Sequence, residues 1–352
     1  MIFWFNNNLI IKFMSNGYAI VVPNYDKRRG IDVPFLIGEN VYKELIKEDE
    51  LGFSLVYADE TIFPDLSNKV VLRDTVRGRK VYVINQLTLP PNETIMGVLL
   101  IIDTLRRCDA EEIVVVEPYI PFLRQDRPQG REPITSRLIG DLYSTAGANR
   151  VMTFHPHVEQ AGMAFGSDCP IEVLPTYKYI ADCYKERCFR RGENLDNSVV
   201  CAPDLGAVKG ARRFANRLGL SIVVISKERT DIDTTGVEQL IGNVEGKKVI
   251  TFDDVIDTGG SSLNAREYLI DKGATSVDIC ATHLGFNNDS KGNNRRREIV
   301  ERGINIIGTD SIPHTFTEEE LRYFDIYPLA PLIARIISYR SRGKSISSFF
   351  NS

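Results

Sequence analysis

The chain has 352 residues, 43% of them hydrophobic and 26% charged, with a formal net charge of −4. Its length corresponds to about two domains, and its composition excludes a disordered chain, a collagen-like chain and a small disulfide scaffold. The charge balance excludes a globally basic nucleic-acid binder, and the sequence has no apolar run long enough to predict a membrane span. The six cysteines form no CxxC pair and indicate buried thiols in a reducing compartment.

The first residues form an apolar run that Asn6–Asn8 interrupt and Lys12 ends. A signal peptide requires a basic start and an unbroken apolar core, which this segment lacks. We therefore expect residues 1–13 to be an extra leader, with Met14 as an alternative start.

Short apolar, β-branched runs alternate along the chain with segments of helical periodicity. The predicted strands are Val70–Leu72, Lys80–Ile84, Glu112–Val116, Arg150–Phe154, Ser198–Cys201, Ser221–Ile225, Lys248–Phe252 and Ser276–Ala281. The predicted helices are Met96–Arg107, Ile134–Ala146, Lys209–Leu218, Leu263–Asp271 and Asn294–Glu301, and the tail from Pro328 predicts one more helix and a final short strand. This alternation predicts βαβ units and mainly parallel sheets with both faces covered.

The alternation occurs twice, on either side of a seam near Pro170–Tyr179. We expect an N-terminal α/β domain over residues 14–175, joined by the C-terminal segment 328–352, and a second α/β domain over residues 176–327. The two halves could be similar domains, which the sequence alone does not prove.

The most specific segment is an apolar strand followed by Asp253, Asp254 and the small-residue loop Asp257-Thr258-Gly259-Gly260-Ser261-Ser262. The two glycines allow a close backbone approach to an anion, and the N–H groups at the start of the next helix can bind a phosphate. The two acids can accept hydrogen bonds from ribose hydroxyls. The alternative is a capped helix after a tight turn. The combination of strand, paired acids and small-residue loop favours the phosphate-binding interpretation over it.

This loop resembles the phosphoribosyl-diphosphate (PRPP) loop of type I phosphoribosyltransferases and of ribose-phosphate diphosphokinases. Other segments resemble the diphosphokinases (PRPP synthetases) over about residues 55–350. They are Phe63-Pro64-Asp65, Arg124-Gln125-Asp126-Arg127, Arg131-Glu132-Pro133-Ile134-Thr135, His157, Ala202-Pro203-Asp204-Leu205-Gly206 and Lys227-Glu228-Arg229. The resemblance implies two phosphoribosyltransferase-type, Rossmann-like domains with the active site between them.

The reaction that the resemblance implies moves the β,γ-diphosphoryl group of ATP to the anomeric hydroxyl of ribose 5-phosphate, with Mg²⁺ as cofactor. By resemblance, Lys227, Arg229 and His157 would be catalytic, and His157 and Asp204 would hold the metal. ATP would be bound by Phe63, Asp65, Arg124, Gln125, Asp126 and His157. The loop would bind ribose phosphate through Asp253, Asp254, Asp257, Thr258, Gly259, Gly260, Ser261 and Ser262. A cytoplasmic dimer or hexamer is implied, without nucleic-acid or membrane partners.

Each residue also has a plainer interpretation. Lys227 and Arg229 could be solvated loop charges, and Asp204 could cap the following helix. His155 would face the same side of a strand as His157 and could share its role. Arg295–Arg297 could be solvated charges or an anion site.

The sequence departs from the family pattern at several positions. Ser67 stands where a glutamate is expected near adenine, and His155-Pro156-His157 stands where the family reads DLH. The loop after Arg127 is shorter than usual, and residues 166–196 are divergent. These departures indicate a divergent member, with a phage-type protein acting in the host cytoplasm as one interpretation.

Three alternatives follow. ADP-ribose could be the acceptor of the same transfer in a phage NAD-rebuilding pathway. A non-catalytic regulatory homologue would be expected to have lost Lys227, Arg229, Asp204 and His157, which all remain. A simple phosphoribosyltransferase would leave Arg124–Arg127 and the first half unexplained.

Overall fold

The computed structural model describes residues 17–25, 36–47, 52–86, 90–128, 130–157, 159–227, 238–288, 292 and 295–349. The chain divides into two compact units. The described part of unit 1 comprises residues up to Thr153, together with 160–172 and 330–346. Unit 2 comprises Phe154–Glu159, Val173–Leu329 and the described residues after 346.

Unit 1 is built on one sheet with the strand order β3-β2-β1-β4-β5-β6-β7, seven strands within the described residues. The strands are β1 (Tyr18–Asn24), β2 (Phe53–Ile62), β3 (Asn68–Leu72), β4 (Lys80–Ile84), β5 (Glu112–Val116), β6 (Arg150–Phe154) and β7 (Ile171–Leu174), the last crossing into unit 2. From β2 to β6 neighbouring strands pair in parallel, whereas β3 is antiparallel to β2. The central strands are nearly continuous apolar runs because helices cover both faces.

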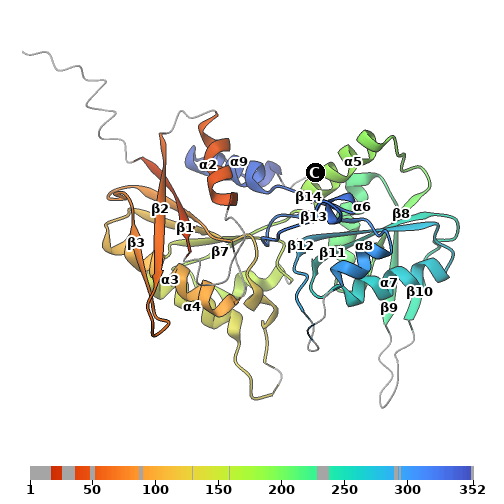
Figure 1. Cartoon of the computed structure of the whole chain (residues 1–352), viewed down its shortest axis with the longest axis horizontal. Helices are drawn as coiled ribbons and strands as arrows, with labels where there is room; N and C mark the ends of the chain where they lie inside the picture. Colours follow the sequence, from red (N-terminus) through yellow and green to blue (C-terminus); the bar gives the residue numbers. More distant parts are fainter. Residues whose placement is uncertain are drawn as a thin grey trace, which may run out of the picture. The chain divides into compact units, whose positions relative to one another are not determined.

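The helices of unit 1 form two packed pairs. Helix α2 (Leu36–Ile46) packs against α9 (Ala330–Ser341), and α3 (Pro91–Arg107) packs against α4 (Thr135–Ala146). Figure 1 shows these pairs on opposite faces of the sheet. Two short 3₁₀ segments, η2 (Pro121–Arg124) and η3 (Glu159–Ala164), lie in the connections.

Unit 2 is built on a second sheet, with the order β10-β9-β8-β11-β12-β13-β14 among the residues that the structure describes. Its strands are β8 (Ser198–Ala202), β9 (Ile222–Lys227), β10 (Glu238–Ile241), β11 (Lys248–Ile256), β12 (Ser276–Leu284), β13 (Ile306–Thr309) and β14 (Phe324–Tyr327). All neighbours are parallel except β9 and β10.

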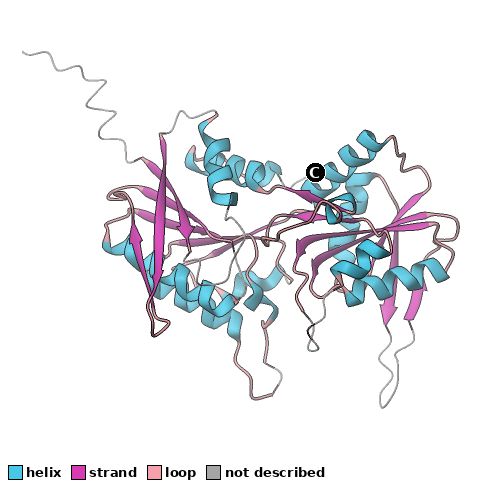
Figure 2. Ribbon diagram, viewed as in Figure 1, coloured by secondary structure: helices cyan, strands magenta, loops and turns pink. Residues whose placement is uncertain are grey.

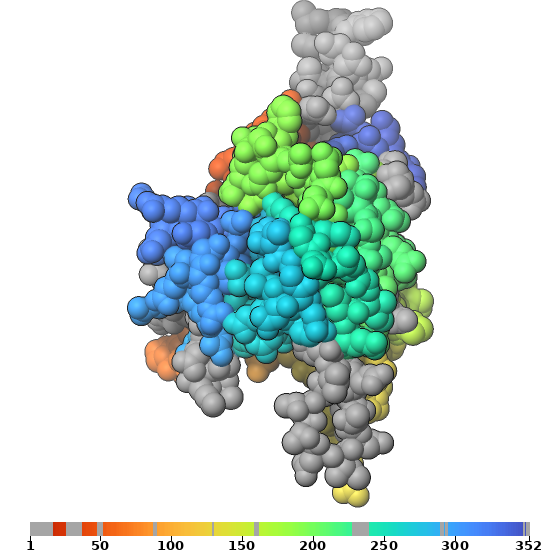
Figure 3. Space-filling model, turned by 90° about the vertical axis from the view of Figure 1, so that its right-hand side faces the viewer, coloured from red at the N-terminus to blue at the C-terminus, as the bar shows by residue number. Residues whose placement is uncertain are grey.

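Helices cover both faces of this second sheet as well (Figures 1 and 2). Helices α5 (Tyr177–Arg191) and α6 (Val208–Leu218) pack together over one face, where Phe214 and Phe252 stack at 4.4 Å. Helices α7 (Gly260–Asp271) and α8 (Arg296–Glu301) cover the other face. Figure 3 shows the outer sides of α5 (yellow-green) and α7 (teal to cyan) at the surface of unit 2.

The two units share one strand order, since subtracting seven from each label of the second sheet gives that of the first. In each sheet the first strand lies next to the fourth, so the chain builds outward in both directions from this pair. This reversal is the switch point, beside which open α/β sheets bind ligands at the carboxyl ends of their strands. The predicted class, two Rossmann-like α/β domains with mainly parallel sheets, is confirmed.

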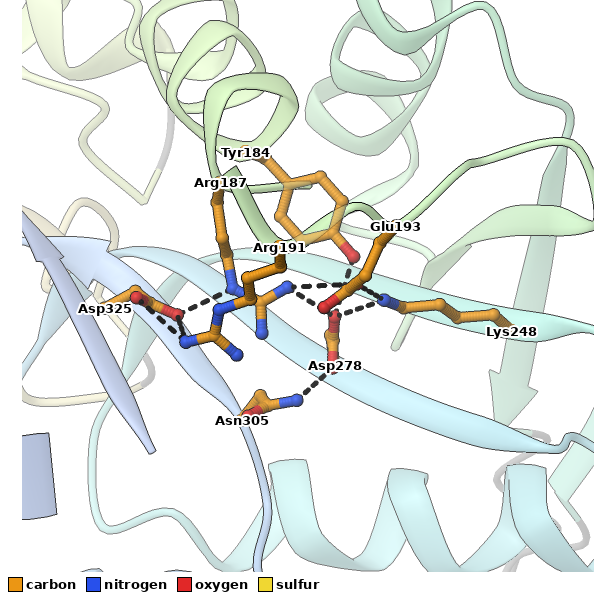
Figure 4. A network of polar contacts seen from close by, with 8 residues as sticks. All are labelled: Tyr184, Arg187, Arg191, Glu193, Lys248, Asp278, Asn305 and Asp325. Carbon is orange, nitrogen blue, oxygen red and sulfur yellow. Dashed lines mark hydrogen bonds and ion pairs between the residues drawn. The ribbon is translucent and has the colours of Figure 1, made fainter. Parts of the chain in front are cut away.

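Near the amino-terminal ends of β11 and β12, unit 2 contains a group of charged and polar side chains that ranges from buried to partly exposed (Figure 4). We call it the α5 ion cluster; it consists of Tyr184, Arg187, Arg191, Glu193, Lys248, Asp278, Asn305 and Asp325. Arg187 is 1% exposed, and its Nε donates to Asp325 at 2.6 Å. Lys248 lies 3.1 Å from Asp278 and 2.5 Å from Glu193. The cluster ties α5 to β11, β12 and β14.

Several predicted elements change in the structure. The predicted final strand is wrong, because Ser347–Phe349 form the 3₁₀ turn η5, whose bonds are local rather than to a sheet edge. Helix α7 begins three residues earlier than predicted, directly after Gly259. The structure has no helix, within its described part, that is long and apolar enough to cross a membrane. All six cysteines are free, and all but Cys108 are buried.

Candidate active site

The loop Asp257–Ser262 follows β11 at the switch point of unit 2, and we call it the phosphate loop after its predicted role. Gly259 is the residue before α7 and has φ +89°, a conformation that glycine adopts readily. A Cβ at this position would meet Cβ of Arg295 at 3.0 Å, so the backbone conformation and the packing both require glycine. The N–H of Gly260 contacts Oγ1 of Thr258 at 3.4 Å and closes the loop.

The loop therefore presents the start of a helix to solvent at the carboxyl end of a parallel strand. The first N–H groups of a helix have no partners within it, and the helix dipole adds positive potential there. Gly260, Ser261 and Ser262 form this first turn, and the serine hydroxyls add donors. Backbone and hydroxyl donors of this kind suit a phosphate group.

Asp257 has a partner that sequence reasoning missed. Asn287, which follows β12, donates from Nδ2 to Oδ1 of Asp257 at 2.8 Å, and its backbone N–H donates to the Asp257 carbonyl at 2.8 Å. The two residues are 30 positions apart, and no motif in the sequence marks Asn287. This double contact fixes the start of the phosphate loop.

Asp253 and Asp254 lie in the final residues of β11. The N–H of Asp254 donates to Oδ1 of Asp253 at 2.8 Å. Burial and the adjacent Asp254 charge raise the pKa of Asp253 well above its ordinary value. Burial acts in the same direction on Asp254, but hydrogen bonds from His157 and Asp253 outweigh it and lower its pKa. The pair therefore holds one proton more readily than two isolated carboxylates would.

His157 meets this pair within unit 2. Its Nδ1 lies 3.0 Å from Oδ2 of Asp254, which is 97 residues further along the chain. The His157 side chain is 49% exposed and that of Asp254 is 15% exposed. The structure thus brings together two of the predicted site residues and leaves the imidazole accessible to a ligand.

Asp204 follows β8, the strand beside β11. Its Oδ1 accepts a hydrogen bond from the N–H of Ala207 at 2.9 Å, just before α6. The capping interpretation is therefore present in the structure. The negative charge of Asp204 also contributes to the raised pKa of Asp253, so the two carboxylates lie close enough at the switch point to interact.

The predicted catalytic pair Lys227 and Arg229 is only partly described. Lys227 is the last residue of β9, where its backbone pairs with Glu238 of β10. Arg229 lies outside the described residues. The roles of both remain predictions.

Phe63 and Asp65 lie in the turn between β2 and β3 of unit 1. The Phe63 N–H donates to the Ser67 carbonyl at 2.7 Å, and the Phe63 ring is 43% exposed. Oδ1 of Asp65 accepts from the N–H and hydroxyl of Ser67 at 3.0 and 2.7 Å, which lowers the pKa of Asp65. Ser67, the departure from the family pattern, thus orders this turn.

The segment Arg124–Asp126 begins at the last residue of η2 in unit 1. The Gln125 carbonyl accepts from the N–H of Ser136 at 3.2 Å, and Asp126 lies 3.7 Å from Arg127. A pocket of about 420 Å³ is lined by Arg124, Gln125, Arg127, Glu132 and Pro133. Two arginines at such an opening could hold an anionic ligand.

The switch point of unit 1 carries a different group. Glu117, directly after β5, is fully buried and accepts from Nδ2 of Asn85 at 2.7 Å and from the Tyr143 hydroxyl. The Tyr25 hydroxyl donates to Oδ1 of Asn85 at 2.6 Å. Burial raises the pKa of Glu117 to about 7. Side chains occupy this position in unit 1, whereas unit 2 has a phosphate loop.

Residues Arg295–Arg297 behave as paired helix charges. Arg295 contacts Glu298 at 2.8 Å and Arg297 contacts Glu301 at 2.7 Å within the same helical segment. Arg296 donates to Glu320 at 2.8 Å. Arg295 and Arg297 agree with the solvated-charge interpretation, whereas Arg296 is only 18% exposed and lies over the Phe316 ring, so it is a packed structural contact.

The repeated strand order and the loop at one switch point define a phosphoribosyltransferase-type α/β protein. Family models match residues 36–147 as the N-terminal domain of ribose phosphate pyrophosphokinase and residues 178–320 as a phosphoribosyl transferase domain. The chain is 36% identical over 306 residues to a ribose-phosphate pyrophosphokinase of Aquifex aeolicus, covering 85% of this chain and 93% of that protein.

A second relative, from Thermosipho africanus, carries the same name and is 36% identical over 314 residues, covering 88% of this chain and 95% of that protein. The solved structure of phosphoribosylpyrophosphate synthetase from Mycobacterium smegmatis matches with a TM-score of 0.77 and 28% identity, over 93% of this chain and 99% of that one. The chain belongs to the ribose-phosphate pyrophosphokinase family, which confirms the predicted resemblance.

Proposed function

We propose that this protein is a ribose-phosphate pyrophosphokinase, the activity also called ribose-phosphate diphosphokinase. In this reaction the anomeric hydroxyl of ribose 5-phosphate attacks the β-phosphorus of ATP, the bond to the α-phosphate breaks, and AMP leaves. The phosphate loop and carboxylate pair at the switch point of unit 2 carry the proposal, together with relatives that match nearly their whole length.

In this proposal unit 2 binds ribose 5-phosphate. The N–H groups and hydroxyls of the loop, from Thr258 to Ser262, bind the 5-phosphate. Asp253 and Asp254 accept hydrogen bonds from ribose hydroxyls, and the His157 contact keeps Asp254 ionised for that purpose. Asp257 supports the loop through Asn287.

Unit 1 and the segment after β9 would handle ATP. Phe63 offers an exposed ring to the adenine, and the ordered Asp65 lies in the same turn. Arg124 and Gln125 line the opening described above, Asp126 is the next residue along the chain, and all three would contact the nucleotide. Lys227 and Arg229 would place positive charge on the transferring group. These roles are supported by the family resemblance.

Mg²⁺ is the cofactor that we propose. The described residues contain no group of three or more His, Cys, Asp or Glu side chains that could hold a metal alone. This suits Mg²⁺, which keeps several waters and binds through few carboxylates plus substrate phosphates. Burial is the main cause of the raised pKa of Asp253, and the charges of Asp254 and Asp204 add to it, so a cation bound beside these carboxylates would favour the ionised form of Asp253. His157 and Asp204 would hold the ion, which when bound neutralises charge on the phosphates.

An AMP-release assay with Mg-ATP tests the proposal, with ribose 5-phosphate, unphosphorylated ribose and ADP-ribose as separate acceptors and products identified by mass. We expect AMP and PRPP with ribose 5-phosphate. Lys227→Ala should abolish turnover, whereas Lys272→Ala, an exposed position at the far end of α7, should not. Turnover with ADP-ribose alone would show that ADP-ribose, and not ribose 5-phosphate, is the acceptor. Absence of AMP release with every acceptor would contradict the proposed function.

The compartment that we propose is the cytoplasm. The free thiols support it, because paired cysteines are usual in oxidising compartments and none is paired here.

A further inference from the structure

The turn that carries His157 is held in an uncommon conformation. His155 directly follows β6 and has φ +36°, which costs a residue with a Cβ about 1 kcal/mol. Its N–H donates to the Leu174 carbonyl at 3.0 Å. On the other side, Nε2 of His283 lies 2.9 Å from the Phe154 carbonyl and 3.2 Å from the His155 carbonyl. Hydrogen bonds to backbone groups therefore hold the turn on both sides, from the Leu174 carbonyl and from the His283 side chain.

The His155 side chain is fixed as well. Its Nδ1 lies 2.6 Å from Oγ1 of Thr282, which in turn contacts Oγ1 of Thr176 at 2.6 Å. Its ring stacks on Phe252 with centroids 5.7 Å apart and an interplanar angle of 15°. Phe252 directly precedes Asp253 in β11, so the same ring contacts the strand that carries the carboxylate pair.

Of the two neutral tautomers of His283, only the one protonated at Nε2 can make these contacts. It is 1% exposed, and its Nδ1 lies 2.8 Å from the hydroxyl of Ser311. Two carbonyls at Nε2 require a proton there, so Nδ1 accepts from Ser311 in the neutral tautomer. Burial lowers the pKa of His283 to about 4, which agrees with this assignment.

We infer that Thr282 and His283, adjacent in β12, are positioning residues that hold the turn 155–157 so that His157 reaches Asp254. His157 is half exposed, yet its Nδ1 lies 3.0 Å from Oδ2 of Asp254. In this inference the turn fixed by β12 keeps the His157 ring at that distance. The inference rests on the proposed function for its catalytic consequence, and on the contacts alone for its geometry.

The kinetic test places Thr282→Val in two backgrounds, the natural protein and His157→Ala, and measures kcat for AMP release. Valine keeps the shape of threonine and removes the hydroxyl that contacts His155. We expect kcat to fall about tenfold in the natural background and less than twofold when His157 is absent, because effects through a shared partner are not additive. Thr282→Ser, which keeps the hydroxyl, should restore most of the activity. Equal losses in both backgrounds, or none in the natural one, would overturn the inference.

A spectroscopic test needs no activity. The chain has four histidines, so ring signals of ¹³C-histidine-labelled protein can be assigned by substitution. The His157 signal should move in Thr282→Val toward its position in Asp254→Asn, and Thr282→Ser should leave it in place. Ser311→Ala, which removes the donor to His283, should act like Thr282→Val and serves if that variant does not fold. An unmoved His157 signal in the folded variants overturns the inference, whereas absent AMP release from the natural protein contradicts only the proposed function.

Discussion

Replacing Arg187 by methionine should destabilise unit 2 far more than the same change at Arg191. Both arginines lie on α5 and both contact Asp325, Arg187 at 2.6 Å and Arg191 at 3.1 Å. The Arg187 side chain is 1% exposed and that of Arg191 is 38% exposed. Arg187 also lies 3.4 Å from Asp278 and 3.5 Å from Glu193. The two substitutions therefore compare a buried cation with a partly solvated one on the same helix (Figure 4).

The magnitude follows from what remains after each change. Removing one partner of a buried ion pair costs about 3–5 kcal/mol, because the other charge stays buried without compensation. Here Lys248 still contacts Asp278 at 3.1 Å, and Arg191 still contacts Asp325, so the cost of Arg187→Met should be near the lower end, about 3 kcal/mol. Arg191→Met removes a partly solvated contact and should cost about 0.5 kcal/mol.

Urea denaturation followed by far-ultraviolet circular dichroism, with hydrogen exchange on peptides of α5 and β14, measures the difference. With a slope of about 2 kcal/mol per molar urea, Arg187→Met should lower the midpoint of unit 2 by about 1.5 M. Arg191→Met should lower it by about 0.25 M. Equal shifts for the two variants, or a stabilised Arg187→Met protein, would show that burial does not set the strength of the α5 ion cluster.

Three further substitutions test other parts of the structure. Glu117→Gln should flatten the pH dependence of stability. The folded pKa of Glu117 is raised to about 7, so this carboxyl stabilises the folded state at low pH, and about 3 kcal/mol of that stability is lost as the pH rises from about 4.5 to 7. Parallel curves of stability against pH for the two proteins would refute this. Gly259→Ala should raise KM for ribose 5-phosphate about tenfold, because alanine is strained at φ +89° and would distort the loop. Gly219→Ala, at φ +77° with open space around it, is the control and should only reduce stability. Equal KM values for the two variants would contradict a role of the loop in binding. Asp254→Asn should lower kcat/KM at least tenfold, since a hydrogen bond to a charged group contributes about 1.5–3 kcal/mol, and Asp271→Asn, exposed at the end of α7, is its control. Unchanged turnover in Asp254→Asn would remove this residue from the site.

The sequence predicts many of the buried strands and amphipathic helices, because their apolar pattern is strong, but the predictions omit the buried strands β1 and β13 and the helix α2. They also omit helix α5, where a charged residue, Arg187, occupies one of the most buried positions. Strand β14 is four residues long with two partly buried positions, too short for a periodic signal. Where polar side chains are buried in networks, hydrophobic patterning alone does not reveal the element.

In the candidate site, too, local motifs can be predicted from the sequence and long-range contacts cannot. The phosphate loop is a contiguous motif, so its strand, its glycines and the helix after it can be predicted together, although that helix begins three residues earlier than predicted. The contact between His157 and Asp254 joins residues 97 apart, and that between His155 and Thr282 joins residues 127 apart. No local spacing encodes such pairs, because they depend on the order of strands in the sheet. The tertiary fold is therefore required to find the support from β12.

The two units show why strand order alone does not make a binding site. Both sheets reverse at the same position, yet unit 1 places Tyr25, Asn85 and Glu117 there, hydrogen-bonded to one another and buried. Unit 2 places Asp254 and a glycine-containing helix start at the corresponding edge, where Ser261 is exposed. A filled switch point stabilises its own sheet, and an open one can bind phosphate. The repeated fold thus supplies two equivalent positions, and the loop residues make the position in unit 2 the one that we propose binds phosphate.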